Sequence, residues 1–220
     1  MAAREIGKRP KRHLHTMTQQ WIAAGFLAVA LTALGAGKQE KNPLMSSDSV
    51  VWAGLDYSKV RMVGPGDFRN PEAIFPATLQ NWNDLFLRER IRKIEGTLKK
   101  GVVTDVGGVN ERNQTATPKQ VVPTAGPDDG VEQSHLTEKD IAEAVRSYKL
   151  ESKSGLGLVF IVDRLVKPAR KGAVYIVFFD VAKREVISAD RVVHSAGGAG
   201  FRNYWFGVIK KADEDLRQYR

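Results

Sequence analysis

The sequence predicts an α+β fold, a mixed sheet that ends in a three-stranded antiparallel meander and carries about three packed helices. Two observations lead to this class. The last third of the chain contains strand-length runs rich in Val, Ile, Phe and Tyr at 158–162, 173–179 and 185–193. The first half alternates strand and helix patterns, which places helices against the sheet. We expect a single domain over residues 50–220.

In the first half, a strand is expected at 50–63, where apolar and polar residues alternate before the turn residues Gly64-Pro65-Gly66. Apolar stripes predict one helix over 79–98, and a short strand pattern follows at 102–106. Residues 107–134 are rich in Gly, Pro, Thr, Asn and Asp and have no sustained period. This composition favours a flexible insertion over a functional loop.

In the second half, Thr137 is expected to cap a helix that begins with acidic residues. Turn residues at 168–172 and 182–184 then separate the three apolar runs. The middle run is apolar on both alternations, as in a strand covered on both faces. After Phe201 the period changes from two to about 3.6, which predicts a C-terminal helix with an aromatic stripe on the sheet.

The N-terminus has the three-part pattern of a secretory signal peptide. A basic segment precedes the uncharged apolar run 21–34, and small residues follow at Gly35-Ala36-Gly37, where cleavage is expected. The run is shorter than the ~20 residues of a spanning helix, which favours cleavage over an uncleaved N-terminal anchor. We therefore expect a signal peptide at 1–37, a linker at 38–49, and a periplasmic or secreted domain. Membrane contact is expected only if the N-terminal segment stays uncleaved.

The charge and cysteine content exclude several classes of protein. Of the 34 basic and 25 acidic residues, five basic and one acidic lie before residue 17, so the formal charge of +9 falls to +5 for the rest of the chain. Such a spread-out excess argues against a nucleic acid partner. The chain has no cysteine, which excludes disulfides, thiolate nucleophiles and cysteine-based metal sites.

Three carboxylates are candidate catalytic residues. Asp56 breaks the first strand pattern, and Asp180 ends the middle apolar run. Carboxylates at strand ends can work as an acid/base pair, although such residues more often cap loops or pair with an arginine. Glu89 lies on an aromatic stripe, where desolvation could favour its protonated form, and a structural ion pair is the alternative.

A glycine loop is the candidate ligand-binding site. Gly197, Gly198 and Gly200 lie between a strand and a helix, with Arg202 following. Exposed N–H groups at such a helix start attract anions such as phosphate. The loop lacks the lysine and Ser/Thr of a phosphate-binding P-loop, so a tight turn that needs positive φ is the favoured interpretation.

No cofactor and no metal site are expected. The sequence contains no HExxH, EF-hand or zinc spacing. His194 and Ser195 are neighbours on a predicted strand, where consecutive side chains point to opposite faces, so a Ser–His couple is not expected between them.

Four motifs carry a resemblance that spans roughly 50–209. They are Trp52-Ala53-Gly54-Leu55-Asp56-Tyr57-Ser58, Trp82-Asn83-Asp84-Leu85, Val177-Phe178-Phe179-Asp180 and Gly197-Gly198-Ala199-Gly200-Phe201-Arg202-Asn203-Tyr204-Trp205. In these motifs the chain resembles a family of uncharacterised secreted bacterial proteins, typical of Bacteroidetes. The resemblance implies an exported location and one compact domain, and it assigns no functional residues.

The sequence favours an exported, non-catalytic domain that binds a protein or another component of the cell envelope. Two alternatives stay open. One is a carboxylate-dependent hydrolase that uses Asp56, Glu89 and Asp180, which requires the three side chains to converge. The other is an anion-binding module at the glycine loop.

Overall fold

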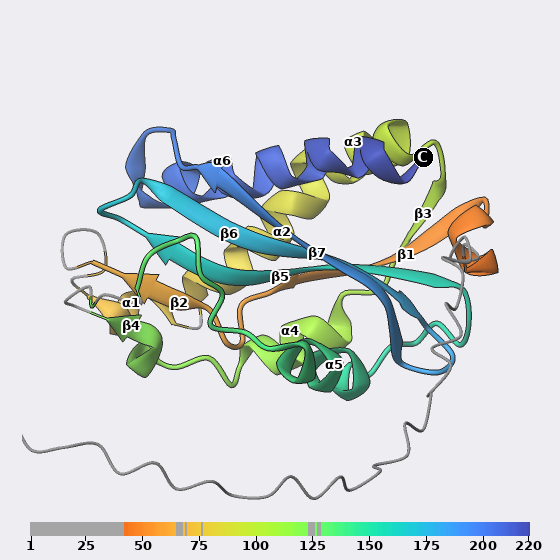
Figure 1. Ribbon diagram of the computed structural model, residues 1–220, viewed down its shortest axis with the longest axis horizontal. Helices are drawn as coiled ribbons and strands as arrows, with labels where there is room; N and C mark the ends of the chain where they lie inside the picture. The colour runs from red at the N-terminus through yellow and green to blue at the C-terminus, as the bar shows by residue number, and fades with distance from the viewer. Residues whose placement is uncertain (1–41, 65–67, 69, 76, 123–125, 127–128) are drawn as a thin grey trace, which may run out of the picture. The chain divides into compact units, whose positions relative to one another are not determined.

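The computed structural model describes residues 42–64, 68, 70–75, 77–122, 126 and 129–220. Seven strands form one sheet (Figure 1). They are β1 (Ser49–Asp56), β2 (Arg61–Val63), β3 (Gly101–Thr104), β4 (Val121–Val122), β5 (Leu156–Val166), β6 (Lys171–Asp180) and β7 (Glu185–Ser195). The predicted signal peptide at 1–37 lies outside the described residues.

The sheet is mostly parallel, and β5 is its central strand. β5 pairs in parallel with β1 and then with β2, while β1 pairs in parallel with β3 and β2 with β4. On its other side β5 pairs antiparallel with β6, which pairs antiparallel with β7. Every residue of β5 is buried, as expected of a strand covered on both faces.

The predicted α+β class, with a C-terminal antiparallel meander as the organising unit, is therefore wrong. The fold is α/β, because the strand that was expected to open the meander also pairs in parallel with β1 and β2, which extend the sheet to β3 and β4. Turn residues mark antiparallel returns in the sequence, but parallel partners are joined by long crossovers that leave no local signal. The meander therefore does not stand apart from the first half of the sheet.

More helices are present than the three or so that the sequence predicted. The α-helices are α1 (Pro71–Ile74), α2 (Ala77–Glu89), α3 (Ile91–Leu98), α4 (Gly107–Asn113), α5 (Glu138–Ser147) and α6 (Gly200–Asp215). Short 3-10 helices are η1 (Pro43–Ser46), η2 (Pro118–Gln120) and η3 (Leu216–Tyr219). The single helix expected at 79–98 is two helices, which meet at Arg90.

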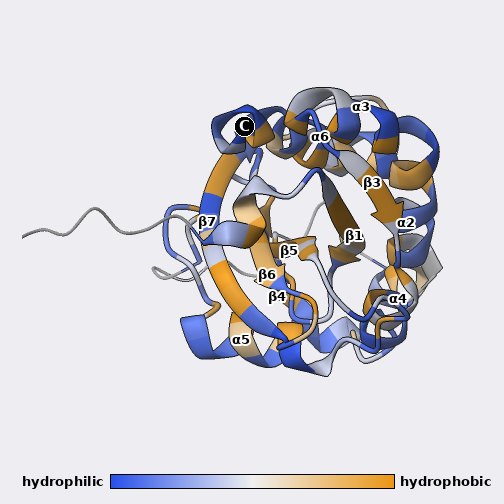
Figure 2. Cartoon of the chain, turned by 90° about the vertical axis from the view of Figure 1, so that its right-hand side faces the viewer, coloured by the Kyte–Doolittle hydropathy of each residue, from blue (hydrophilic) through white to orange (hydrophobic). Residues whose placement is uncertain are grey.

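Helices cover both faces of the sheet. The helices α2, α3 and α6 lie on one face, and α4 and α5 lie on the other (Figure 1). On the first face Trp52 stacks on Phe86 with ring centroids 4.6 Å apart, and Phe160 meets Trp52 edge-on. On the second face Tyr148 packs against Phe179. Figure 2 shows the apolar strands between the two helical layers, whose outward surfaces are hydrophilic.

The strand expected at 50–63 is interrupted. Asp56 lies opposite Ile161 of β5, and Arg61 lies opposite Arg164, so residues 57–60 form an excursion between β1 and β2. We call these four residues the β1–β2 interruption. The register of β5 with β6 shifts at the same level, between Val162 and Arg164. Because bulges of this kind are common beside functional sites, this level of the sheet is a candidate location for one.

Residues 107–134, which composition marked as a flexible insertion, contain regular structure where they are described. Helix α4 begins the stretch, and η2 leads into β4. Gly108 allows α4 to approach the chain after α5, because a Cβ there would lie 2.5 Å from the Lys149 nitrogen. The stretch therefore helps to build the sheet edge and one helical layer.

The predicted linker at 38–49 also contains regular structure, since η1 and the first residue of β1 fall within it. In the part of the chain that the structure describes, no helix has the length and apolar character needed to cross a membrane.

Candidate functional site

Asp56 is buried and fully engaged in hydrogen bonds. Its Oδ2 accepts from the Tyr148 hydroxyl at 2.7 Å and from Arg112 Nε at 3.2 Å, and its Oδ1 accepts from the Ser58 amide at 2.7 Å. Burial, with the neighbouring Asp56 carboxylate, raises the pKa of Tyr148 well above its ordinary value, so the phenol stays protonated and donates. These bonds fix the end of β1 and its interruption.

Asp180 lies far from Asp56. Its Oδ1 accepts hydrogen bonds from the amides of Ala182 and Lys183, which closes the β6–β7 turn. Asp180 is opposite Leu156 and Asp56 is opposite Ile161 on β5, five residues further along. This offset corresponds to about 16 Å along the strand, beyond the ~10 Å upper range of two-carboxylate hydrolases.

Glu89 is half-exposed at the end of α2 and forms an ion pair of 3.3 Å with Lys210 of α6. It belongs to the helical layer on one face of the sheet, whereas Asp56 is bonded to Arg112 of α4 and to Tyr148 at the end of α5, on the other face. The structure therefore does not bring the three candidate carboxylates together.

The glycine loop folds back onto the helix that it precedes. The Gly197 amide donates to the Tyr204 carbonyl at 2.9 Å, and a Cβ on Gly207 would lie 2.5 Å from the Gly197 carbonyl oxygen. Gly198 and Gly200 have φ values of 131° and 76°, which favour glycine. Arg202 is exposed and bonds the adjacent Asn203 side chain at 3.3 Å. Close packing and positive φ values therefore explain why glycine occupies these positions.

Polar side chains satisfy the backbone of the β1–β2 interruption. Asn83 and Asn113 bond the main chain of Leu55, at the end of β1 beyond its register with β3, and Asn113 also accepts from the Tyr57 amide. Gln120 Nε2 donates to the carbonyls of residues 57, 58 and 60. A cavity of about 330 Å³ opens beside them. Because the polar side chains beside the interruption bond its own backbone, we assign it a structural role.

A buried charge cluster at the β5 bulge is a feature that sequence reasoning missed. Asp163 is fully buried, with Arg191 Nε at 2.7 Å and His135 Nδ1 at 2.6 Å. The other imidazole nitrogen, Nε2, lies 2.7 Å from the Lys59 carbonyl. Burial acts to raise the pKa of Asp163, but its contacts with His135 and Arg191 outweigh that effect and lower it. The signal in the sequence was a charged pair, Asp163-Arg164, inside an apolar run.

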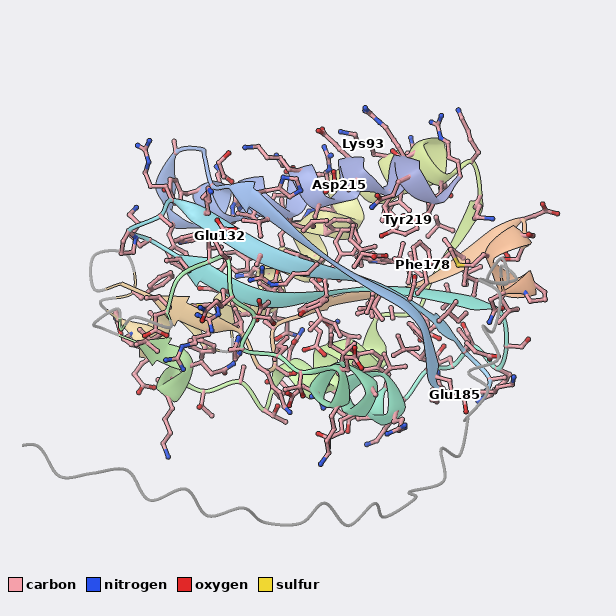
Figure 3. All side chains as sticks on the ribbon, viewed as in Figure 1. Lys93, Glu132, Phe178, Glu185, Asp215 and Tyr219 are labelled. Carbon is pink, nitrogen blue, oxygen red and sulfur yellow. The ribbon has the colours of Figure 1, made fainter. Side chains whose placement is uncertain are left out.

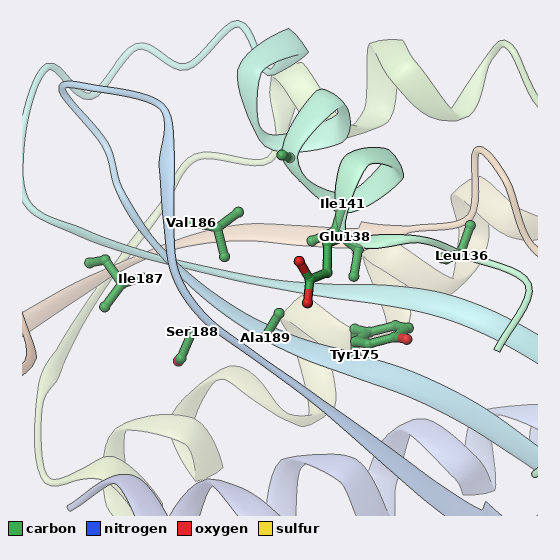
Figure 4. A pocket seen from close by; sticks show the side chains of 9 residues that line it. Leu136, Glu138, Ile141, Tyr175, Val186, Ile187, Ser188 and Ala189 are labelled. Carbon is green, nitrogen blue, oxygen red and sulfur yellow. The ribbon is translucent and has the colours of Figure 1, made fainter. Parts of the chain in front are cut away.

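A cavity lies between α5 and the last two strands, and we call it the α5 cavity. Its volume is about 520 Å³. Tyr175 and the apolar side chains of β7 form its floor, and Glu138 points into it from the first turn of α5 (Figure 4). The residues that line it are Leu136, Glu138, Ile141, Ala142, Tyr175, Val186, Ile187, Ser188 and Ala189.

A second cavity, the η3 cavity, lies on the opposite face of the sheet and has a volume of about 380 Å³. Tyr219 of η3 stands at its wall and packs on Phe178 with ring centroids 4.9 Å apart (Figure 3). The residues that line it are Met45, Ser46, Lys100, Ile187, Ser188, Gln218, Tyr219 and Arg220. Ile187 and Ser188 line both cavities, so the two open on either side of the same point of β7.

β7 is the edge strand between these cavities. Within the described residues it pairs with β6 and with no other strand. Its register with β6 shifts around Ile187 and then continues from Ser188 to Ser195. An edge strand presents unpaired N–H and C=O groups to which another chain can add. The strongest candidate binding site is therefore the β7 edge with its two flanking cavities.

Among the described residues, no group of three or more His, Asp or Glu side chains is placed to hold a metal ion. No protein-family model, no curated protein and no solved structure matches the chain.

Proposed function

We propose that the protein is an exported, non-catalytic domain that binds a protein partner of the cell envelope or the extracellular space through the β7 edge. One observation supports this binding surface. The long edge strand β7 has a cavity on each face of the sheet at Ile187 and Ser188. Export rests on the basic, apolar and small-residue pattern of the first 37 residues.

The geometry supports the other two hypotheses less well. Asp56 and Asp180 are too far apart to act on one bond, and Glu89 belongs to a different layer of the fold. The glycine loop is packed on the first turns of α6, and Arg202 bonds its own neighbour.

Photo-crosslinking in the cells that produce the protein tests the binding surface. A photoreactive residue at the exposed edge position Ala189 of the full chain should give a discrete adduct with one partner. The matched position is Glu95, which is exposed on α3 and is not among the residues that line either cavity. No adduct at position 189, or the same adducts at both positions, would refute the β7 edge as the binding surface.

Fractionation of the same cells tests export. We expect the protein outside the cytoplasm, with a mature N-terminus close to residue 36 or 38 by mass spectrometry. A cytoplasmic protein that retains residue 1 would contradict the proposed export.

A further inference from the structure

The backbone edge of β7 can accept an added strand. Residues 188–195 keep an uninterrupted register with β6, so they have the regular geometry that strand addition needs. In this mode the main chain supplies hydrogen bonds, and alternate side chains of the added strand point to opposite faces of the sheet. The two cavities lie on those two faces, at the start of this segment.

The α5 cavity is suited to a basic side chain. Glu138 is the charged residue among those that line it, and in the described part of the chain no cation lies within ion-pair distance of this carboxylate. Tyr175 offers an aromatic ring on the cavity floor, against which a cation is also favourable (Figure 4). An added strand lies about 4.8 Å beyond β7, so a long side chain such as lysine or arginine is needed to reach both groups.

The η3 cavity has the opposite charge. Lys100 and Arg220 line it. Within the described residues both donate to backbone carbonyls, Lys100 to Met45 and Ser47 and Arg220 to Thr97, and no side-chain carboxylate pairs with either. An acidic side chain entering this cavity would meet two cations that have no anionic side chain beside them.

We infer that β7 binds an extended segment of the partner protein as an added strand, with Lys or Arg entering the α5 cavity and a neighbouring Asp or Glu entering the η3 cavity. The two residues are adjacent in the partner because consecutive positions of a strand face opposite sides. This inference rests on the proposed function and specifies the chemistry of the partner.

The probe is a displayed library of random decapeptides, selected on the immobilised full chain. Enriched sequences should contain a basic residue next to an acidic residue within a run of strand-forming residues. Glu138→Gln should weaken binding of a selected peptide at least about fivefold, because a charge-assisted contact is lost. Glu72→Gln is the matched control, since it removes an exposed acid from the first turn of α1 and should leave binding unchanged.

Reversing the charge sharpens the test. A library selected on Glu138→Lys should replace the basic residue by an acidic one and keep the strand pattern. Enrichment without the charged pair, or the same enrichment on wild type and Glu138→Lys, would overturn the inference. So would a failure to enrich any sequence above an unrelated immobilised protein.

Hydrogen exchange checks the mode of binding on the unmodified full chain. A selected peptide should slow exchange of β7 amides and leave β3, the opposite edge of the sheet, unchanged. Protection elsewhere would overturn strand addition. A dimer that protects β7 without peptide would overturn it as well, because a second copy of the chain would be the occupant. An adduct at position 189 with a partner that lacks the charged pair would refute this inference and leave the proposed function standing.

Discussion

Asp163 is a fully buried carboxylate that contacts two basic side chains. It holds Arg191 at 2.7 Å and His135 at 2.6 Å, and the two basic side chains in turn bond the carbonyls of Lys59 and of residues 131–133. The carboxylate therefore ties the chain before α5 to the centre of the sheet. A bulge in β5 provides the space for it, because Asp163 has no partner in the register with β6.

Replacing Asp163 with Asn should destabilise the fold by about 3–5 kcal/mol, because the largely buried Arg191 side chain would lose its anionic partner. Urea unfolding of the wild type and the variant measures the difference. Asp190→Asn is the control, since Asp190 is an exposed residue of β7 whose carboxylate accepts a hydrogen bond from the Tyr219 hydroxyl, and it should cost much less. A loss below about 1 kcal/mol for Asp163→Asn would contradict the role given to the cluster.

The same carboxylate should contribute to acid unfolding. Its pKa in the folded protein lies below the value of about 3.9 for an unfolded aspartate, because its contacts with His135 and Arg191 outweigh its burial. Its stabilising contribution is therefore present above that unfolded value and is lost as the pH falls through the folded pKa. Urea midpoints of wild type and Asp163→Asn should converge as the pH is lowered from neutral into the acid range. A constant difference would contradict the lowered pKa.

At the scale of single elements, close packing of β5 on β6 depends on Gly157. A Cβ at this position would lie 2.3 Å from the Phe179 ring, and that ring is buried in the cluster beneath α5. The glycine therefore lets an aromatic side chain cross the central strand. A Cβ on Gly96, on the exposed side of α3, would meet nothing within 4 Å outside its own helix, so this glycine serves no such contact.

Gly157→Ala should therefore cost about 1–3 kcal/mol through overpacking. Gly96→Ala should instead stabilise the protein by about 0.4–1 kcal/mol, because alanine restricts the unfolded chain and fits a helix interior. Thermal unfolding of both variants gives the comparison. Equal effects, or a stable Gly157→Ala, would show that Phe179 can move away without cost.

At the scale of the whole molecule, protection should decrease from the centre of the sheet to its edges. β5 is buried along its whole length, whereas β3 is mostly exposed and β7 is half-exposed. Native-state hydrogen exchange should show β5 amides opening only with global unfolding, and β3 amides opening through local fluctuations. Slower exchange in β3 than in β5 would contradict this order.

Much of the local structure could be predicted from the sequence, but not how the strands pair. The cap at Thr137 is confirmed, with Asp140 completing it, because capping is a local interaction. The apolar runs after residue 156 are strands, as predicted, because the composition that favours a strand is also local. The parallel neighbours of β5 begin about a hundred residues earlier, and nothing near either strand specifies that pairing.

The candidate site was harder to predict than the elements. Asp56, Glu89 and Asp180 were singled out by residue type and position, and each forms bonds within its own part of the fold. The β7 edge has no such chemical signature, because it is defined by the lack of a second partner strand among the described residues. An edge position and a pair of cavities follow from the sheet order, which single-sequence periodicity does not reveal.

The late position of β5 has a consequence for how the chain folds during synthesis. Until residues 156–166 have been made, β1 with β3 and β2 with β4 are two short pairs without a strand to join them. The roughly hundred residues between β1 and β5 take about 5–20 seconds to synthesise at ribosomal rates of about 5–20 residues per second. Closing the long loops to β5 then carries an entropic cost that slows folding further. A chain that stays open for so long suits passage through a narrow translocation channel, as the proposed export requires.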